Sequence, residues 1–338
     1  MDLSDRKALK QEAAQRLQAA TYDPRKLVLI HTAIALGASA LVSIVNYFVS
    51  GQIEGTGGLA GMGSRGILTT IQAVLQLGVN IAMPFWQMGL FFVMLHLIRR
   101  QTVRPMDLRE GFFRFGPVLR LQILRLLMYL AVGILSLNVG VTLFLMTPLA
   151  DPMNQLLTQL NEEMANNASF VMDEATAMAV METVFPALVL VGILYAVLLI
   201  PLLYRFRMAE YAMMDQDKPG AAAAMHVSFR LLKGNCLQLF RLDLSFWWFY
   251  LIQVLILVVS NAHILLPMLE ISLPVSQDVL CFVGYGVFFL GQLGLFWRAG
   301  AQVEGTYALA YDQLRSARYP MHREKPQTPP QTPWGAWK

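Results

Sequence analysis

Charged residues are scarce in this sequence of 338 residues: Asp, Glu, Lys and Arg make up 14%, whereas 56% of the residues are hydrophobic. A soluble domain carries roughly a quarter charged residues. The apolar residues therefore exceed what one water-soluble core can bury, and the surplus is expected to face lipid. The composition predicts an integral membrane protein.

Cysteine and paired histidine are also nearly missing. Only two cysteines occur, Cys236 and Cys281. The topology predicted below places them on opposite sides of the membrane, which excludes a disulfide framework. The five histidines are scattered, and none has the spacing of a metal or hydrolase site. Because no nucleophile–base pair or phosphate-binding loop accompanies them, we expect no enzymatic activity and no cofactor.

Long apolar runs are abundant. A helix needs about 20 apolar residues to cross the hydrocarbon core of a bilayer. Six runs reach that length, so we predict an all-α bundle of about six transmembrane helices within residues 27–314, at residues 27–49, 67–98, 118–147, 184–204, 244–261 and 279–297. The intervening segments near 51–66, 148–183 and 262–278 are predicted to be outer loops, and residues 52–66 a Gly-rich loop.

The basic residues orient these helices. Apart from Arg65, every Lys and Arg lies in or beside residues 1–26, 99–125, 205–241 and 298–338. The predicted loops 148–183 and 262–278 contain acidic residues and no Lys or Arg. The positive-inside rule then predicts that both termini are cytoplasmic. The net charge of +4 is thus explained by membrane topology, and nucleic acid is not an expected partner.

The two ends of the chain have different characters. Residues 1–26 are predicted to hold an amphipathic cytoplasmic helix that lies on the inner leaflet, with Ser4 as N-cap and Leu9, Ala13 and Leu17 on its apolar face. Residues 315–338 are rich in proline, and we expect a disordered cytoplasmic tail that could bind a protein partner. The plan of amphipathic helix, span, outer loop and span recurs loosely along the chain, which indicates a three-fold repeat of helix hairpins.

One segment carries a family resemblance. Residues 228–235 read SFRLLKGN, residues 239–247 read LFRLDLSFW, and a Tyr-containing segment follows at 307–311. With these motifs, residues 205–314 resemble the DUF975 family of uncharacterised bacterial integral membrane proteins, and the rest of the chain matches it more loosely. The resemblance implies a location in the bacterial plasma membrane, and it implies no activity.

The motif of this segment supplies the candidate site, which consists of Lys233, Asn235, Arg241, Asp243 and Ser245. Gly234 suits a left-handed helix C-cap. The carboxylate of Asp243 enters the bilayer and needs a partner, for which the candidates are Arg241, Arg120, Arg125 and Arg298. The favoured interpretation is an ion pair that locks the fifth span to its neighbours. The alternative is a cytoplasm-facing site for an anionic headgroup or substrate.

Two functions remain open. A non-enzymatic membrane scaffold or accessory protein, with membrane lipids as partners, agrees with the amphipathic helices, the basic inner surface and the Pro-rich tail. A small-solute or ion transporter or channel agrees with the repeat and with polar residues inside the spans. These are His31, Asn46, Gln72, Gln76, Asn80, Gln87, Asn138, Gln253 and Gln292. A solute pathway would need several of them around one cavity at mid-membrane depth, and for His31 we expect a hydrogen bond to a neighbouring helix.

Overall fold

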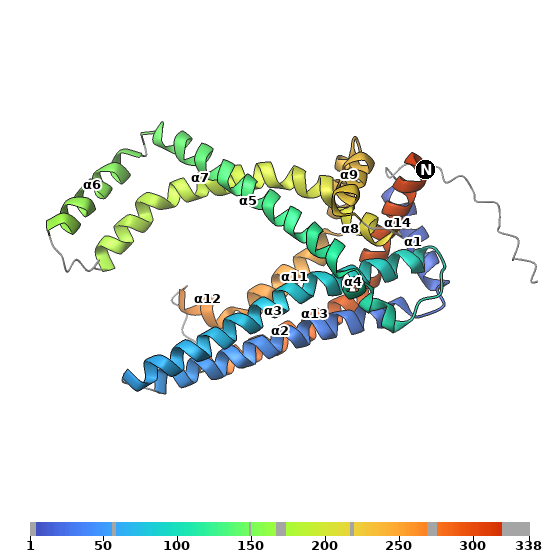
Figure 1. The fold of residues 1–338 in the computed structure, drawn as a ribbon, viewed down its shortest axis with the longest axis horizontal. Coiled ribbons are helices and arrows are strands. Elements are labelled where there is room, and N and C mark those ends of the chain that lie inside the picture. The colour runs from blue at the N-terminus through green and yellow to red at the C-terminus, as the bar shows by residue number, and fades with distance from the viewer. Residues whose placement is uncertain are drawn as a thin grey trace, which may run out of the picture. The chain divides into compact units, whose positions relative to one another are not determined.

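The computed structural model describes residues 5–55, 59–148, 150–166, 174–216, 220–268 and 276–319. These residues form helices joined by short connections, with no strand among them (Figure 1). The all-α prediction is confirmed. The chain divides into two compact units, which are residues Met1–Val118 with Met208–Lys338 (unit 1) and Leu119–Arg207 (unit 2).

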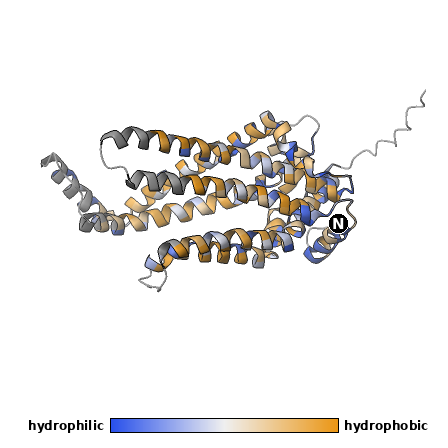
Figure 2. Ribbon diagram, turned by 90° about the horizontal axis from the view of Figure 1, so that it is seen from below, coloured by the Kyte–Doolittle hydropathy of each residue, from blue (hydrophilic) through white to orange (hydrophobic). Residues whose placement is uncertain are grey.

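Five helical segments within the described residues are long and apolar enough to cross a membrane. They are Pro24–Val45, Ile67–Ile98, Phe115–Leu145, Val184–Met214 and Val279–Arg318. A sixth span results if α10 (Cys236–Leu244) and α11 (Trp247–Ser260), which bend by 60° at their junction, are counted as one. Figure 2 shows that hydrophobic residues follow the long helices over most of their length. The chain therefore has the helices of a membrane-spanning protein.

The predicted Gly-rich loop at residues 52–66 is wrong for most of its length. Helix α2 (Pro24–Gly55) continues through residues 52–55, and α3 (Leu59–Ile98) already includes residues 59–66. Glycine has a low helix propensity, but this is a weak bias of about 1 kcal/mol per residue. Continuing the helix gives each backbone N–H and C=O an internal partner, which matters most next to a bilayer.

The core of unit 1 lies at the end of the helices that carries the basic residues, called the basic end below. Here α1 (Arg6–Gln18) and the last turns of α3 pack against α14 (Ala301–Arg318), and α8 (Ala209–Met214) packs against α3. All residues of α8 except the half-buried Glu210 are buried, and so is most of α14 from Val303 to Leu314.

Helix α1 has the predicted apolar face, but protein covers it. Leu9, Ala13 and Leu17 are each less than 7% exposed, because α14 and α3 pack on them. This face therefore packs on protein, and the predicted location of the helix on the inner leaflet stays a prediction. An amphipathic pattern shows that a face is buried and does not show what buries it. The N-cap is Asp5, whose carboxylate accepts a hydrogen bond of 3.0 Å from the amide of Ala8, and Ser4 lies outside the described residues.

Two short elements pack backbone to backbone against α3. The 3₁₀ turn η1 (Pro105–Arg109) and α4 (Glu110–Phe113) lie on α3 at two glycines. A Cβ atom at Gly89 would overlap the carbonyl of Leu108, and one at Gly111 would overlap the carbonyl of Phe85. Glycine is required at both positions because nothing larger allows this approach.

The C-terminal part of unit 1 pairs α11 with α13 (Gln277–Leu295), with α12 (Ala262–Met268) packed beside them. A π-helical turn, η2 (Phe296–Gly300), joins α13 to α14 without a break. Helix α14 continues to Arg318, so residues 315–318, which were predicted to belong to the disordered tail, are helical. Residues 320–338, with their predicted disorder and protein partner, lie outside the described residues.

Unit 2 contains most of α5 (Phe115–Leu145), α6 (Ala150–Asn166) and α7 (Glu174–Phe206). The predicted outer loop 148–183 is therefore largely helical, in line with the helical periodicity of its apolar residues. Phe144, Ala150 and Ala187 form a small buried cluster, with Met153 and Leu190 packed against it. Most other apolar side chains of α5 and α7 are exposed, as lipid-facing helices require.

Candidate functional site

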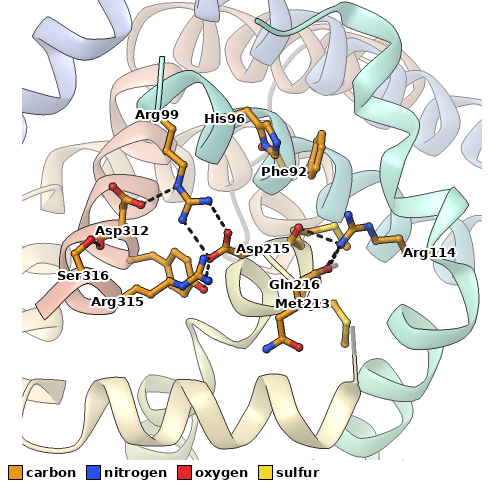
Figure 3. Close-up of polar contacts among 12 residues, drawn as sticks. Phe92, His96, Arg99, Arg114, Met213, Asp215, Gln216, Asp312, Arg315 and Ser316 are labelled. Atoms are coloured by element: carbon orange, nitrogen blue, oxygen red, sulfur yellow. Dashed lines mark hydrogen bonds and ion pairs between the residues drawn. The ribbon is translucent and has the colours of Figure 1, made fainter. Parts of the chain in front are cut away.

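A buried aspartate centres the ionic contacts at the basic end of unit 1 (Figure 3). Asp215 directly follows α8, and its side chain is 5% exposed. The guanidinium of Arg99 binds both carboxylate oxygens, at 2.5 Å and 3.1 Å. Arg315 also pairs with this carboxylate, and the hydroxyl of Tyr311 donates to it at 2.9 Å. Two arginines and a tyrosine thus compensate one buried negative charge.

The contacts continue from Arg99 to helix α1. The Nε atom of Arg99 donates a hydrogen bond to the carboxylate of Asp312 at 2.8 Å, so the Arg99 side chain bridges two carboxylates. Arg16 approaches the other oxygen of Asp312 at 3.9 Å and binds Glu12 at 2.6 Å. Gln313 donates to the same Glu12 carboxylate at 2.9 Å. We call Arg99, Asp215, Tyr311, Asp312 and Arg315 the Asp215 network, and it joins the ends of α3, α8 and α14.

Local geometry at the end of α3 places Arg99 in this network. The helix ends at Ile98, and Arg100 has φ +58°, the left-handed conformation that commonly follows a helix. Arg99 therefore stands where α3 leaves the apolar core, beside the buried C-terminus of α8. Its side chain is 19% exposed, so both carboxylates are bound largely away from water.

Other basic side chains at this end bind the final carbonyls of helices. Arg114 Nη1 donates to the carbonyls of Met213, Met214 and Gln216, at 3.3, 3.0 and 2.8 Å, around the C-terminus of α8. Arg16 Nη1 donates to the carbonyl of Ile98, the last residue of α3, at 3.3 Å. These carbonyls have no partner within their own helix, and the negative end of the helix dipole favours a cation.

The same arrangement occurs at the predicted site. Helix α1 supplies Arg6, which donates to the carbonyl of Arg241 at 3.2 Å, and Lys10, which donates to that of Ser245 at 2.7 Å. The Lys10 ammonium also lies 3.7 Å from the ring centre of Phe246. Burial, with the adjacent Arg6 charge, lowers the pKa of Lys10 from its ordinary value.

Helix α9 (Ala221–Leu232) is capped in the same way from α14. Arg318 donates to the carbonyl of Arg230 and, at 2.6 Å, to that of Lys233. Gly234 has φ +87°, which matches the predicted left-handed cap. Lys233 therefore takes part through its backbone, as Arg241 and Ser245 do. The side-chain amide of Asn235 donates to the backbone carbonyl of Leu231, four residues earlier, at 3.1 Å.

Asp243 has a neighbour that the sequence did not indicate. The hydroxyl of Tyr307, on α14, donates to its carboxylate, and the hydroxyl of Tyr250 lies 3.0 Å from that of Tyr307. The Ser245 hydroxyl turns back to the carbonyl of Leu242 at 2.5 Å. Asp243 therefore ties α10 to α14, and its predicted pairing with an arginine stays a prediction.

Three of the predicted polar residues in the spans meet at one pocket. It has a volume of about 340 Å³ and is lined by His31, Ala35, Asn80, Met83, Pro84, Trp86 and Gln87. The His31 ring is stacked on Trp86, with ring centres 5.6 Å apart, and the Trp86 indole donates to the His31 carbonyl at 3.0 Å. Contrary to expectation, Nε2 of His31 has no hydrogen-bond partner among the described residues.

The ionic contacts at the basic end join α1, α3, α8 and α14. Within the part of the chain that the structure describes, no three His, Cys, Asp or Glu side chains gather as a metal site would. The motif that supplied the candidate site includes neither Asp215 nor Asp312. The signal for Asp215 was an acidic residue inside the basic segment 205–241, directly after a fully apolar stretch.

Comparisons with known proteins give one match. A family model described as "Protein of unknown function (DUF975)" matches residues 1–290. Neither the curated proteins nor the solved structures contain a significant match to this chain. The match covers most of the chain and extends the resemblance seen in residues 205–314 to the N-terminus. The chain therefore belongs to the DUF975 family of proteins of unknown function.

Proposed function

We propose that this protein is a non-enzymatic scaffold or accessory protein of the bacterial cytoplasmic membrane, with both termini in the cytoplasm. The observation that carries the proposal is that charged side chains at the basic end bind other helices. Asp215 and Asp312 both bind Arg99, and Arg16 and Arg114 bind helix carbonyls. These groups hold helix ends together, which is the property that a rigid membrane platform needs.

A second set of cations supports a role towards lipid. Lys7 and Arg109 are exposed in unit 1 outside the apolar spans, and Arg25 and Lys26 are exposed in the first turn of the span Pro24–Val45. Exposed cations beside a membrane attract anionic headgroups, by about 1 kcal/mol each. The buried cations thus stabilise the fold, while the exposed ones are available to phosphatidylglycerol or to an anionic partner protein.

The test measures the melting temperature of the full chain in nanodiscs with increasing phosphatidylglycerol in phosphatidylcholine. The proposal expects the melting temperature to rise with the anionic fraction, and the rise to shrink in a variant with Lys7, Arg25, Lys26 and Arg109 all changed to Gln. A matched control changes the exposed acids Asp151→Asn, Glu162→Gln and Glu182→Gln in unit 2, and should keep the rise. A melting temperature that ignores lipid charge contradicts the proposal.

A small-solute transporter is the second candidate, because one observation favours it. His31, Asn80 and Gln87 line a single pocket between two spans, as a solute pathway would require. The two functions differ in a direct measurement. A scaffold in sealed proteoliposomes leaves the permeability to small polar solutes and ions at that of protein-free vesicles, whereas a transporter raises it.

A further inference from the structure

The pocket between α2 and α3 lies at the middle of two predicted spans. Ala35 is central in the span Pro24–Val45, and Met83 is central in the span Ile67–Ile98. Pro84 stands beside them inside α3. Because proline has no N–H, the backbone carbonyl of Asn80 cannot receive its usual hydrogen bond from residue 84. A helix interrupted at this depth needs another partner for that carbonyl.

The side chains of the pocket add hydrogen-bonding groups. His31 is 7% exposed, and its Nε2 has no partner among the described residues. A buried polar atom left in this way costs about 1–3 kcal/mol when it stays unpaired. The oxygen of the Asn80 side chain already accepts from Gln76 at 3.0 Å, so Asn80 contributes its N–H donors. Gln87 supplies a donor and an acceptor.

The charge and size of the pocket restrict what it can hold. None of the seven lining residues is Asp, Glu, Lys or Arg, so an ion would be desolvated here without compensation. The volume of about 340 Å³ is at the lower end of the range for small-molecule sites. Met83, Ala35 and the face formed by Trp86 offer an apolar wall. A small uncharged group with an apolar body fits these conditions.

The unpaired histidine nitrogen narrows the chemistry further. In one tautomer Nε2 accepts a hydrogen bond, and in the other it donates one. A hydroxyl group can do either, and it can also interact with the Asn80 and Gln87 amides. A carbonyl group can only accept, so it would suit one tautomer alone. The hydroxyl is therefore the group that the pocket accommodates most readily.

We propose that the pocket between α2 and α3 binds an uncharged hydroxyl-bearing molecule, with the hydroxyl at Nε2 of His31 and the body of the molecule against Trp86 and Met83. The hydroxyl completes the hydrogen bonding of the buried imidazole. The molecule is either a membrane-dissolved alcohol or a water-soluble polyol, since both carry the recognised group. This site goes beyond the scaffold role, which requires no ligand of its own.

The experiment uses the full chain in nanodiscs and two photoreactive probes. One is a long-chain primary alcohol with a diazirine beside the hydroxyl carbon, and the other is the same diazirine chain without the hydroxyl (the deoxy probe), which neither donates nor accepts a hydrogen bond at that position. After illumination, peptide mass spectrometry locates the label. We expect the alcohol to label the α2–α3 pocket about tenfold more than the deoxy probe, as one hydrogen bond to a buried polar group implies.

Variants connect this labelling to His31. His31→Phe keeps a ring for stacking on Trp86 and removes both nitrogens, so alcohol labelling should fall to the level of the deoxy probe. His31→Gln keeps a hydrogen-bonding group and should retain part of it. Asn138→Leu is the matched control, because Asn138 lies in a span of unit 2 and bonds to Ile134 of its own helix at 2.7 Å. It should leave pocket labelling unchanged.

The outcomes separate support from contradiction. Competition by glycerol would support hydroxyl recognition and show that the molecule arrives from water, whereas competition by unlabelled long-chain alcohol alone would show that it arrives from the bilayer. Equal labelling by the alcohol and the deoxy probe overturns the proposal, and so does full labelling of His31→Phe. If His31→Phe does not fold, His31→Gln and Gln87→Leu provide the same comparison.

Discussion

Polar side chains along α5 in unit 2 and arginines at the basic end of unit 1 are satisfied in different ways. In unit 2, Ser136, Asn138 and Thr142 each bond to the carbonyl four residues earlier in α5, at 2.7 Å. In unit 1, Arg99 and Arg114 bond to residues more than ninety positions away in the sequence. A helix whose polar groups are satisfied internally can face lipid alone. Hydrophobicity therefore explains why both units have spans, and long-range ionic contacts specify which helix ends meet in unit 1.

The largest effect is expected when the centre of the Asp215 network is removed. Asp215→Ala leaves Arg99 and Arg315 without their shared carboxylate in a buried place. Removing one member of a buried ion pair costs about 3–5 kcal/mol. The melting temperature in detergent should fall strongly, while Asp151→Ala, at an exposed position in unit 2, should leave it unchanged. Equal melting temperatures for the two variants would contradict the claim that ionic contacts between helices stabilise unit 1.

A smaller loss is expected at the cap of α8. Arg114→Gln loses the charged donor shared by three carbonyls, and hydrogen bonds to charged groups contribute about 1.5–3 kcal/mol. The exposed neighbour Arg109→Gln is the control. The backbone amides of α8 should exchange hydrogen faster in Arg114→Gln and at the parent rate in Arg109→Gln. Unchanged exchange in both would mean that Arg114 does not hold this helix end.

The close approach on α3 predicts a loss of similar or smaller size. Gly89→Ala places a methyl group onto the carbonyl of Leu108, and overpacking of this kind costs about 1–3 kcal/mol. Gly78→Ala, in the same helix, meets nothing within 4 Å and should be neutral or slightly stabilising. Thermal melting of the pair checks this difference, and its absence would show that η1 does not rest on α3.

The smallest effect is expected in unit 2. Asn138→Leu removes a side chain whose hydrogen bond is to its own helix, at a position exposed on α5. Stability should change by less than about 0.5 kcal/mol. A loss as large as that of Arg114→Gln in the same melting assay would show that unit 2 also depends on polar contacts between helices.

Much of the fold could be predicted from the sequence because its signals are local. Runs of apolar residues predict the spans, and the pattern of Leu9, Ala13 and Leu17 predicts the buried face of α1. The sequence could not predict which surface packs on this face of α1, because lipid and α14 are both apolar. The helical extent of residues 52–66 was missed because glycine content is only a weak bias against helix.

The candidate site was less predictable, because it depends on residues far apart in the chain. The sequence indicated that Asp243 needs a partner, but the hydroxyl of Tyr307 is 64 positions away and carries no local signal. Asp215 looks like an ordinary loop acid until α3 and α14 bring Arg99 and Arg315 to it. The sequence identified the polar residues inside the spans. Which of them share a pocket could not be predicted, because only the fold brings His31, Asn80 and Gln87 together.

The central claim is that the charges of unit 1 bind one another across helices. A double-mutant cycle of Arg99→Gln and Asp215→Asn, unfolded in mixed detergent micelles, measures their coupling directly. A close, buried pair of opposite charges predicts a coupling free energy of about 1.5 kcal/mol or more. Single effects that add to within about 0.5 kcal/mol, as they do for independent sites, would contradict the claim.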